Sequence, residues 1–170
     1  VLKMYARHYK TGEAIPDEMI AKLEKSATFG QGFATTEYLA SSILDMEYHT
    51  QTKPITGKAT DFERQAMEKA GLIAAITPRH SSTHFGHIFS GGYSAGYYSY
   101  IWSGVLDTDA FDQFKKTDLF DQEKAASFRN NILAKGDTED PMILYKKFKG
   151  SEPSIEPLLR KRGLNTGKSL

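Results

Sequence analysis

Apolar side chains recur every three or four residues in several stretches of the chain, which is the period of an amphipathic helix. The first such stretch runs from Ala14 to Ser26 and opens with Pro16, a residue suited to a first helical turn. Its apolar stripe consists of Met19, Ile20 and Leu23. The pattern therefore predicts a helix near the start of the chain.

A second helix is predicted from about Phe33 to His49, after two glycines that interrupt the chain. The residues expected to face the core are Phe33, Leu39, Ile43, Leu44 and Met46. A third helix is predicted to start at the capping box Thr60-Asp-Phe-Glu63, run to about Ala70 and end at Gly71. The apolar run 72–77 is read as either a strand or a passage from helix to loop.

The second half of the chain continues this helical pattern. The tyrosine-rich stretch is predicted to be helical from near Gly92 through Trp102 to about Leu106. Further helices are expected at 107–114, 120–133, 141–148 and 154–162, with an exposed loop at 136–140 and a polar tail at about 165–170. Seven or so helices with short connections, in one segment covering 1–170, predict an all-α architecture.

Composition excludes several classes of function. Lys and Arg number 22 against 21 Asp and Glu, so the formal net charge of +1 gives no reason to expect a nucleic-acid or membrane partner. The chain has no cysteine, which excludes disulfides and thiolate zinc sites and fits a cytoplasmic location. Its first residue is Val1 and its first ten residues do not resemble a signal peptide. We therefore expect the chain to begin inside a longer polypeptide or after processing.

The stretch from His84 to Tyr100 carries the most informative chemistry, because it combines histidines, tyrosines and glycines. On a continuous helix Tyr93, Tyr97 and Tyr100 would share one face, whereas Tyr98 would point about 100° away from Tyr97. Phenolic O–H donors beside an imidazole suit a site that stabilises a developing oxyanion. The alternative is an aromatic core helix whose hydroxyl groups bond to backbone or water.

The histidines invite a search for metal chemistry. His80 and His84 are four residues apart, but the residues between them are Ser81-Ser-Thr83, without the glutamate of a His-Glu-x-x-His motif. A metal site formed by these two residues with His87 stays an alternative. The carboxylates of the second predicted helix have no histidine partner at ligand spacing; they are Glu37, Asp45 and Glu47. Nucleotide-binding loops and a Gly-x-Ser-x-Gly motif are also missing from the sequence.

The run His87-Ile-Phe-Ser-Gly-Gly-Tyr-Ser-Ala-Gly-Tyr-Tyr-Ser-Tyr-Ile-Trp102 resembles the substrate-binding loop and helix of the thimet-oligopeptidase family of zinc metallopeptidases. Within that family it is most similar to the bacterial peptidyl-dipeptidases (Dcp type). The flanking stretches that support the resemblance are 6–12, 32–39, 106–111, 148–153 and 158–164. The resemblance thus covers nearly the whole chain.

The family's zinc motif, His-Glu-x-x-His with a downstream glutamate, is missing from this sequence. The resemblance therefore implies the C-terminal helical portion of a zincin-type catalytic domain, with the zinc ligands in a missing N-terminal part of the same polypeptide. It implies hydrolysis of short peptides and an isolated segment that is inactive. Release of C-terminal dipeptides is the expected mode, and internal cleavage within short peptides stays an alternative. In such enzymes zinc polarises the scissile carbonyl and activates water, while the glutamate of the motif acts as base.

The resemblance also implies roles for individual residues. His87, Tyr93 and Tyr100 match the histidine and tyrosines that bind substrate and stabilise the oxyanion, with His87 and Tyr100 as the catalytic pair. Tyr97 is a further candidate for substrate binding. Gly91 and Gly92, which also count as substrate-binding positions, would let the loop move onto bound peptide.

Two points stay open at the level of the sequence. Arg79 could hold the free carboxylate of a peptide substrate, although a solvated surface arginine is the more common case. The alternative function is a non-catalytic helical module that binds peptides or a partner protein.

Overall fold

The computed structural model describes residues 1–164, and their regular structure is helical. Extended backbone pairs once within this range, in an isolated antiparallel bridge between Arg7 and Ala14. The polar tail predicted at 165–170 lies outside the described residues. The prediction of an all-α fold is confirmed for the part of the chain that the structure describes.

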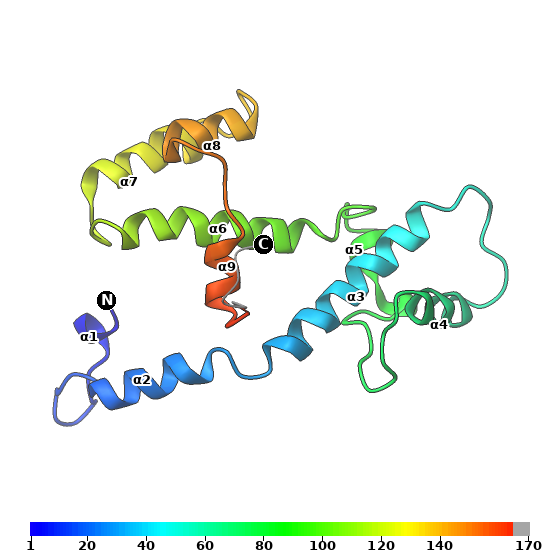
Figure 1. The fold of residues 1–170 in the computed structure, drawn as a ribbon, viewed down its shortest axis with the longest axis horizontal. Helices are drawn as coiled ribbons and strands as arrows, with labels where there is room; N and C mark the ends of the chain where they lie inside the picture. The colour runs from blue at the N-terminus through cyan, green and yellow to red at the C-terminus, as the bar shows by residue number, and fades with distance from the viewer. Residues whose placement is uncertain (165–170) are drawn as a thin grey trace.

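The helices follow one another along the chain, and the short connections expected from the sequence are found only in part, because long loops join α3 to α4 and α4 to η1 (Figure 1). In chain order they are α1 (Leu2–Tyr5), α2 (Asp17–Ser26), α3 (Gln31–His49), α4 (Ala59–Lys69), the 3-10 helix η1 (Ser82–His84), α5 (Gly86–Phe89), α6 (Ser99–Lys115), α7 (Gln122–Phe128), the π-helix η2 (Arg129–Leu133), α8 (Pro141–Lys149) and α9 (Glu156–Lys161).

The helices form an open assembly with two ends. Figure 1 shows α4 and α5 beside the C-terminal end of α3. It shows α7 and α8 along α6, on the side of α6 opposite to α2 and α3. The helix α6 runs between these two groups, and α9 packs against it. The arrangement leaves room for two separate hydrophobic clusters.

The first cluster joins α3, α4, α5 and the turn before α6; its buried members are Ala40, Leu44, Ala66, Met67, Phe85, Ile88 and Tyr97. The second joins α6 to α7, η2 and α8; its buried members are Ala110, Tyr145 and Phe148, with Leu106, Phe114, Phe128 and Ile132 packed against them. Burial of apolar surface therefore holds each end of the molecule together through its own small core.

The helix α3 forms where it was predicted, but its inward face was predicted wrongly. Of the five residues expected inside, only Leu44 is buried. The other four, Phe33, Leu39, Ile43 and Met46, are each more than a third exposed. The buried side chains of α3 are Ala40, Ser41, Ser42, Leu44 and Asp45. Among them, the polar side chains of Ser41 and Asp45 accept hydrogen bonds from backbone N–H groups of other segments. Because their hydrogen bonds are satisfied, these polar side chains can be buried.

The start of α4 also differs from the prediction. The helix begins at Ala59, so Thr60 lies inside it and no side chain caps its first turn. Glu63 accepts hydrogen bonds from the Ser82 backbone N–H (2.6 Å) and the Ser81 hydroxyl (3.3 Å). The capping box is therefore not formed, because its glutamate holds η1 in place. Gly71, with a φ of +75°, follows the end of the helix as predicted.

The later elements follow the prediction more closely. The run 72–77 is a loop, α6 extends without a break through 107–114, and the helix expected at 120–133 consists of α7 and η2. The helices α8 and α9 match the predicted ranges within two residues, and each has a proline in its first turn.

Candidate active site

The tyrosine-rich stretch is a turn followed by a helix, and the prediction of one continuous helix from Gly92 is wrong. The helix α6 begins at Ser99, so Tyr93 and Tyr97 lie before it and Tyr100 lies in its first turn. Ala95 has a φ of +55° and is the one residue other than glycine with a positive φ in the part of the chain that the structure describes. This left-handed residue breaks the helical path.

The turn nevertheless brings the predicted rings together. Tyr93 stacks on Tyr100 with ring centroids 5.3 Å apart, and Tyr97 meets Tyr100 edge-on at 5.2 Å. The His87 ring joins this cluster, 6.0 Å from Tyr93 and 5.7 Å from Tyr97. Tyr98 is half exposed and lines a separate hollow beside α3, away from this cluster.

The hydroxyl groups of this cluster differ in access. Tyr93 and Tyr100 are 36% and 44% exposed, whereas Tyr97 is 3% exposed. The interaction with the Tyr93 hydroxyl, followed by desolvation, raises the pKa of Tyr100 to about 12. Tyr100 therefore keeps its proton at neutral pH and can donate a hydrogen bond. The accessible donors are Tyr93 and Tyr100, whereas the buried Tyr97 contacts the Tyr100 and His87 rings.

Several contacts fix the buried Tyr97. The Tyr38 hydroxyl donates to the Tyr97 carbonyl oxygen (2.8 Å) and accepts from the Ile101 N–H (3.1 Å). Burial raises the pKa of Tyr97, and the nearby Arg79 opposes that shift. Arg79 in turn lies 3.8 Å from the Glu37 carboxylate. The guanidinium group thus belongs to the surroundings of the tyrosine cluster.

The histidines of this region do not form a metal site. His80 stacks on Phe85 and lies 4.7 Å from the His87 ring; burial, His87 and Arg79 lower its pKa. His84 pairs with the Thr83 hydroxyl. Among residues 1–164, no three His, Asp or Glu side chains lie close enough to hold a metal ion. The residues present therefore do not fit a zinc ion.

Asp45 is the site residue that the sequence analysis underestimated. Its side chain is 0% exposed and accepts hydrogen bonds from the backbone N–H groups of Ala95 and Tyr97, both at 2.9 Å. His49, one helical turn further along α3, lies 2.8 Å from the same carboxylate. Asp45 was predicted to have no histidine partner at ligand spacing, and this prediction was wrong, because the spacing Asp45-x-x-x-His49 places the two side chains on one helix face.

The glycine loop is packed tightly on α5. A Cβ atom at Gly91 would lie 2.9 Å from the Cα and carbonyl oxygen of His87, and Gly92 has a φ of +79°. The Tyr93 N–H donates to the His87 carbonyl oxygen (3.0 Å), and the Ser94 hydroxyl donates to the Ile88 carbonyl oxygen (2.5 Å). Glycine at 91 is therefore required by close backbone approach.

A hollow of different character lies away from the tyrosine cluster. It has a volume of about 480 Å³ between α6 and α9, with Asp107, Asp112, Arg160 and Lys161 among its lining residues. Asp112 pairs with Arg160 at 3.1 Å, and Asp107 with Lys161 at 3.6 Å. Asp107 and Asp112 are thus each paired with a cation, whereas the tyrosine cluster presents two exposed hydroxyl groups.

Comparison with known proteins identifies the family. The model of peptidase family M3 matches residues 1–164. The chain belongs to peptidase family M3. This M3 segment is 38% identical over 167 residues to a dipeptidyl carboxypeptidase of Escherichia coli (strain K12), covering 97% of the segment and 24% of the relative. It is 40% identical over 169 residues to a probable cytosolic oligopeptidase A of Arabidopsis thaliana, covering 96% and 24%.

A third relative, an oligopeptidase A of Haemophilus influenzae, is 35% identical over 164 residues, with 96% of the segment and 24% of the relative covered. The M3 segment thus spans about a quarter of the length of the curated relatives it matches. Across the described residues, no helix is both long and apolar enough to cross a membrane. The family confirms the resemblance noted in the sequence, whereas the roles of His87, Tyr93, Tyr97, Tyr100, Gly91 and Gly92 stay predictions.

Proposed function

We propose that the M3 segment forms the substrate-binding and transition-state-stabilising wall of a metallopeptidase that hydrolyses short peptides. The observation that carries this proposal is the exposed Tyr93–Tyr100 pair with His87 beside it, on a surface backed by the first hydrophobic cluster. Two accessible phenols and an imidazole in contact are suited to bind a peptide carbonyl.

In this proposal Tyr100 donates its O–H to the oxygen that becomes negative when water adds to the scissile carbonyl. Its pKa of about 12 keeps the donor protonated, and the stacked Tyr93 holds the ring in place. Donors of this kind contribute roughly 2.7–4 kcal/mol to transition-state stabilisation. His87 binds the peptide next to this oxygen, and Tyr97 positions the other two tyrosines from the core side.

The metal cofactor of the proposed enzyme is zinc, which membership of family M3 supports. Since the described residues do not build a ligand set, we assign the zinc ligands to polypeptide outside this segment. The partner of the segment is accordingly the remaining part of the same polypeptide, and the isolated segment is inactive. A cytoplasmic location belongs to the same proposal and is supported by the absence of cysteine.

We further propose that the enzyme releases C-terminal dipeptides. Relatives from Escherichia coli and Salmonella typhimurium carry the name dipeptidyl carboxypeptidase. Such an enzyme needs a cation for the substrate carboxylate, and Arg79 is the only lysine or arginine between Lys69 and Lys115. Its guanidinium group lies beside the tyrosine cluster. Replacing Arg79 with Gln should raise KM for peptides with a free carboxylate more than for their C-terminal amides.

The direct test of the function is Tyr100→Phe in the complete enzyme. Loss of one oxyanion donor should lower kcat by about 10²–10³-fold and leave the zinc content unchanged. Tyr98→Phe is the matched control, because this hydroxyl belongs to a half-exposed ring beside a different hollow. Unchanged turnover in Tyr100→Phe, or loss of zinc, would contradict the role of Tyr100.

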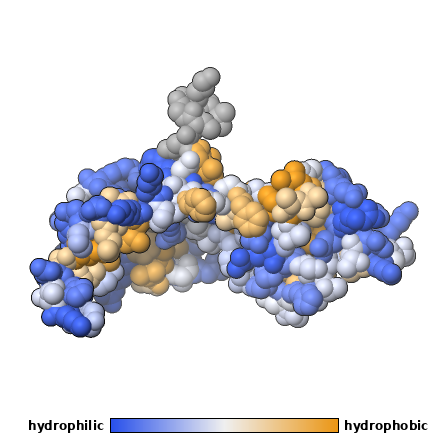
Figure 2. All heavy atoms as spheres, turned by 90° about the horizontal axis from the view of Figure 1, so that it is seen from below, coloured by the Kyte–Doolittle hydropathy of each residue, from blue (hydrophilic) through white to orange (hydrophobic). Residues whose placement is uncertain are grey.

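A non-catalytic peptide- or protein-binding module is the second candidate. It is favoured by the number of large apolar side chains that the segment exposes, among them Phe29, Phe33, Ile73 and Trp102. Figure 2 shows such apolar patches separated by hydrophilic surface on one face. Peptide affinity in a polypeptide that lacks hydrolytic activity would support this function over the first.

A further inference from the structure

The turn before α6 depends on a carboxylate from another helix. Asp45 lies on α3, fifty residues before Ala95, and its two oxygen atoms each accept one backbone N–H of the turn. Oδ1 accepts from Ala95 and Oδ2 accepts from Tyr97, both at 2.9 Å. Because the carboxylate is completely buried, water cannot replace either bond.

The backbone at this turn is unfavourable without such support. Ala95 is in the left-handed region, which an L-residue with a Cβ atom adopts only at a cost in free energy. Two N–H groups that point at one buried carboxylate can offset this cost, since charge-assisted hydrogen bonds are stronger than neutral ones. The turn directs the chain from Tyr93 past Tyr97 into the first turn of α6, where Tyr100 lies.

We propose that Asp45 is a positioning residue for the tyrosine cluster: it holds the left-handed turn that places Tyr93 and Tyr100 side by side. The inference rests on the proposed function for its effect on catalysis, but the structural part stands on the contacts alone. His49, at 2.8 Å, supplies a partner for the buried carboxylate on its own helix. Asp45 itself does not contact substrate in this account.

Replacing Asp45 with Asn tests the proposal with little change in shape. The amide has one acceptor oxygen, whereas both N–H groups of the turn need an acceptor, so one of them would face an N–H₂ donor. The matched control is Asp109→Asn, which alters a second buried aspartate that accepts from Tyr145, Lys149 and Ser154 in the other cluster. Both variants lose a buried charge, but only the first touches the turn.

In the complete enzyme Asp45→Asn should lower kcat by about 10–100-fold, less than the roughly 10²–10³-fold loss expected when an oxyanion donor itself is removed, and change KM by less than about threefold. Zinc content should equal that of the wild type. Amide hydrogen exchange at Ala95 and Tyr97 should accelerate. Asp109→Asn should lower the melting temperature without changing kcat or the exchange of these two amides.

A rescue experiment separates positioning from general stability. Glycine adopts a positive φ without strain, so Ala95→Gly added to Asp45→Asn should recover a large part of the lost kcat. The same glycine should not restore the melting temperature of Asp109→Asn. Equal losses of kcat in both aspartate variants, or no rescue, would overturn the proposal.

Hydrogen exchange in the unaltered protein gives a test that does not need a folded variant. The amides of Ala95 and Tyr97 must be protected if Asp45 binds them, and rapid exchange at both would overturn the inference. If the complete protein has no peptidase activity, the proposed function fails, and the exchange data still decide whether Asp45 holds the turn.

Discussion

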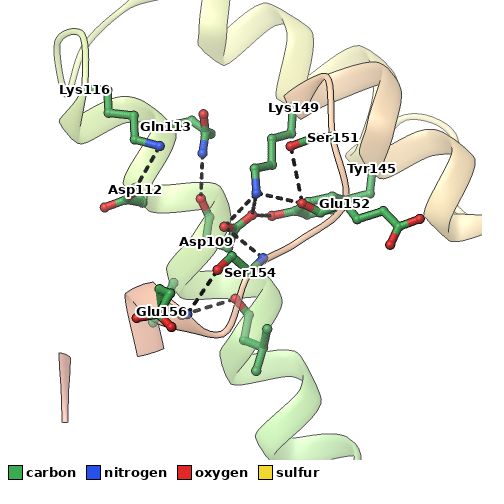
Figure 3. A network of polar contacts seen from close by, with 12 residues as sticks. Asp109, Asp112, Gln113, Lys116, Tyr145, Lys149, Ser151, Glu152, Ser154 and Glu156 are labelled. Carbon is green, nitrogen blue, oxygen red and sulfur yellow. Dashed lines mark hydrogen bonds and ion pairs between the residues drawn. The ribbon is translucent and has the colours of Figure 1, made fainter. Parts of the chain in front are cut away.

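Two buried aspartates organise the two ends of this molecule, and they do so for different purposes. Asp109 is 2% exposed and joins α6 to α8 and to the segment before α9 through Tyr145 (2.6 Å), Lys149 (2.8 Å) and Ser154 (3.2 Å), as Figure 3 shows. Asp45, in contrast, binds two backbone N–H groups of a turn. One aspartate connects elements to one another, and the other fixes the conformation of a loop.

The partners explain why only one of these networks lies beneath a candidate active site. The Lys149 side chain is only 10% exposed, so the Asp109 network contains its own largely buried counter-charge. The turn above Asp45 continues into side chains that remain accessible, namely Tyr93 and Tyr100. A buried polar network can therefore stabilise the fold alone or also position side chains on a neighbouring surface. The accessibility of the residues connected to the network distinguishes the two cases.

The largest expected effect comes from removing the counter-charge at Asp109. Lys149→Met would leave a buried carboxylate without its cation, which typically costs about 3–5 kcal/mol of folding free energy. Urea unfolding followed by circular dichroism measures this loss. The kcat per folded molecule should not change. A loss of kcat in the folded variant would contradict the view that the Asp109 network stabilises the fold without affecting the candidate active site.

A smaller effect is expected for Tyr145→Phe. The hydroxyl donates to Asp109 at 2.6 Å in a buried position, and a hydrogen bond to a charged group is worth about 1.5–3 kcal/mol. The same unfolding measurement applies, and Tyr48→Phe, whose exposed hydroxyl bond to Ala59 is 3.4 Å long, is the control. Equal stability of the two variants would contradict the importance of the Asp109 network.

At the other end, Gly91→Ala should act on activity more than on stability. The added Cβ meets His87 backbone atoms at 2.9 Å, so the loop must shift away from α5. We expect a loss of about tenfold in kcat, equivalent to about 1.4 kcal/mol, with a nearly unchanged melting temperature. Gly86→Ala, where the new atom would lie 3.6 Å from the flexible Ser90 hydroxyl, is the control.

The smallest effect should appear in acid. Burial opposes ionisation of Asp109, but Lys149, Tyr145 and Ser154 together hold its pKa below the ordinary value of 3.8. Its contribution to stability is therefore complete above pH 3.8 and is lost as the pH falls further toward the lowered pKa. The unfolding free energy measured between pH 5 and 2 should fall less steeply in Asp109→Asn than in the wild type, and parallel curves would contradict this.

Much of the helical framework could be predicted from local signals. Prolines in the first turns of α8 and α9, and Gly71 after α4, mark boundaries that depend on neighbouring residues alone. The turn at Ala95 could not be predicted in this way. Its left-handed backbone is stabilised by the Asp45 carboxylate, fifty residues earlier in the chain. The periodicity of neighbouring residues cannot predict a contact between such distant positions.

The inward face of α3 was missed for a related reason. Apolar residues were assigned to the core, but Ser41 and Asp45 are buried because they accept hydrogen bonds from His80 and from the turn. The exposed Leu39, Ile43 and Met46 occupy the face that the apolar pattern assigned to the interior. The candidate residues His87, Tyr93 and Tyr100 came from the resemblance of the run 87–102 to a family motif, which does not depend on the local conformation, and their roles stay predictions.

We propose that Tyr100 binds the transition state of peptide hydrolysis. The most direct measurement compares the affinity of a phosphinic peptide, which mimics the tetrahedral intermediate, with that of a substrate peptide for wild-type and Tyr100→Phe enzyme. We predict that affinity for the phosphinic peptide falls by the same factor as kcat/KM, while substrate affinity changes little. An unchanged affinity for the phosphinic peptide, or an equal loss for both ligands, would contradict the account.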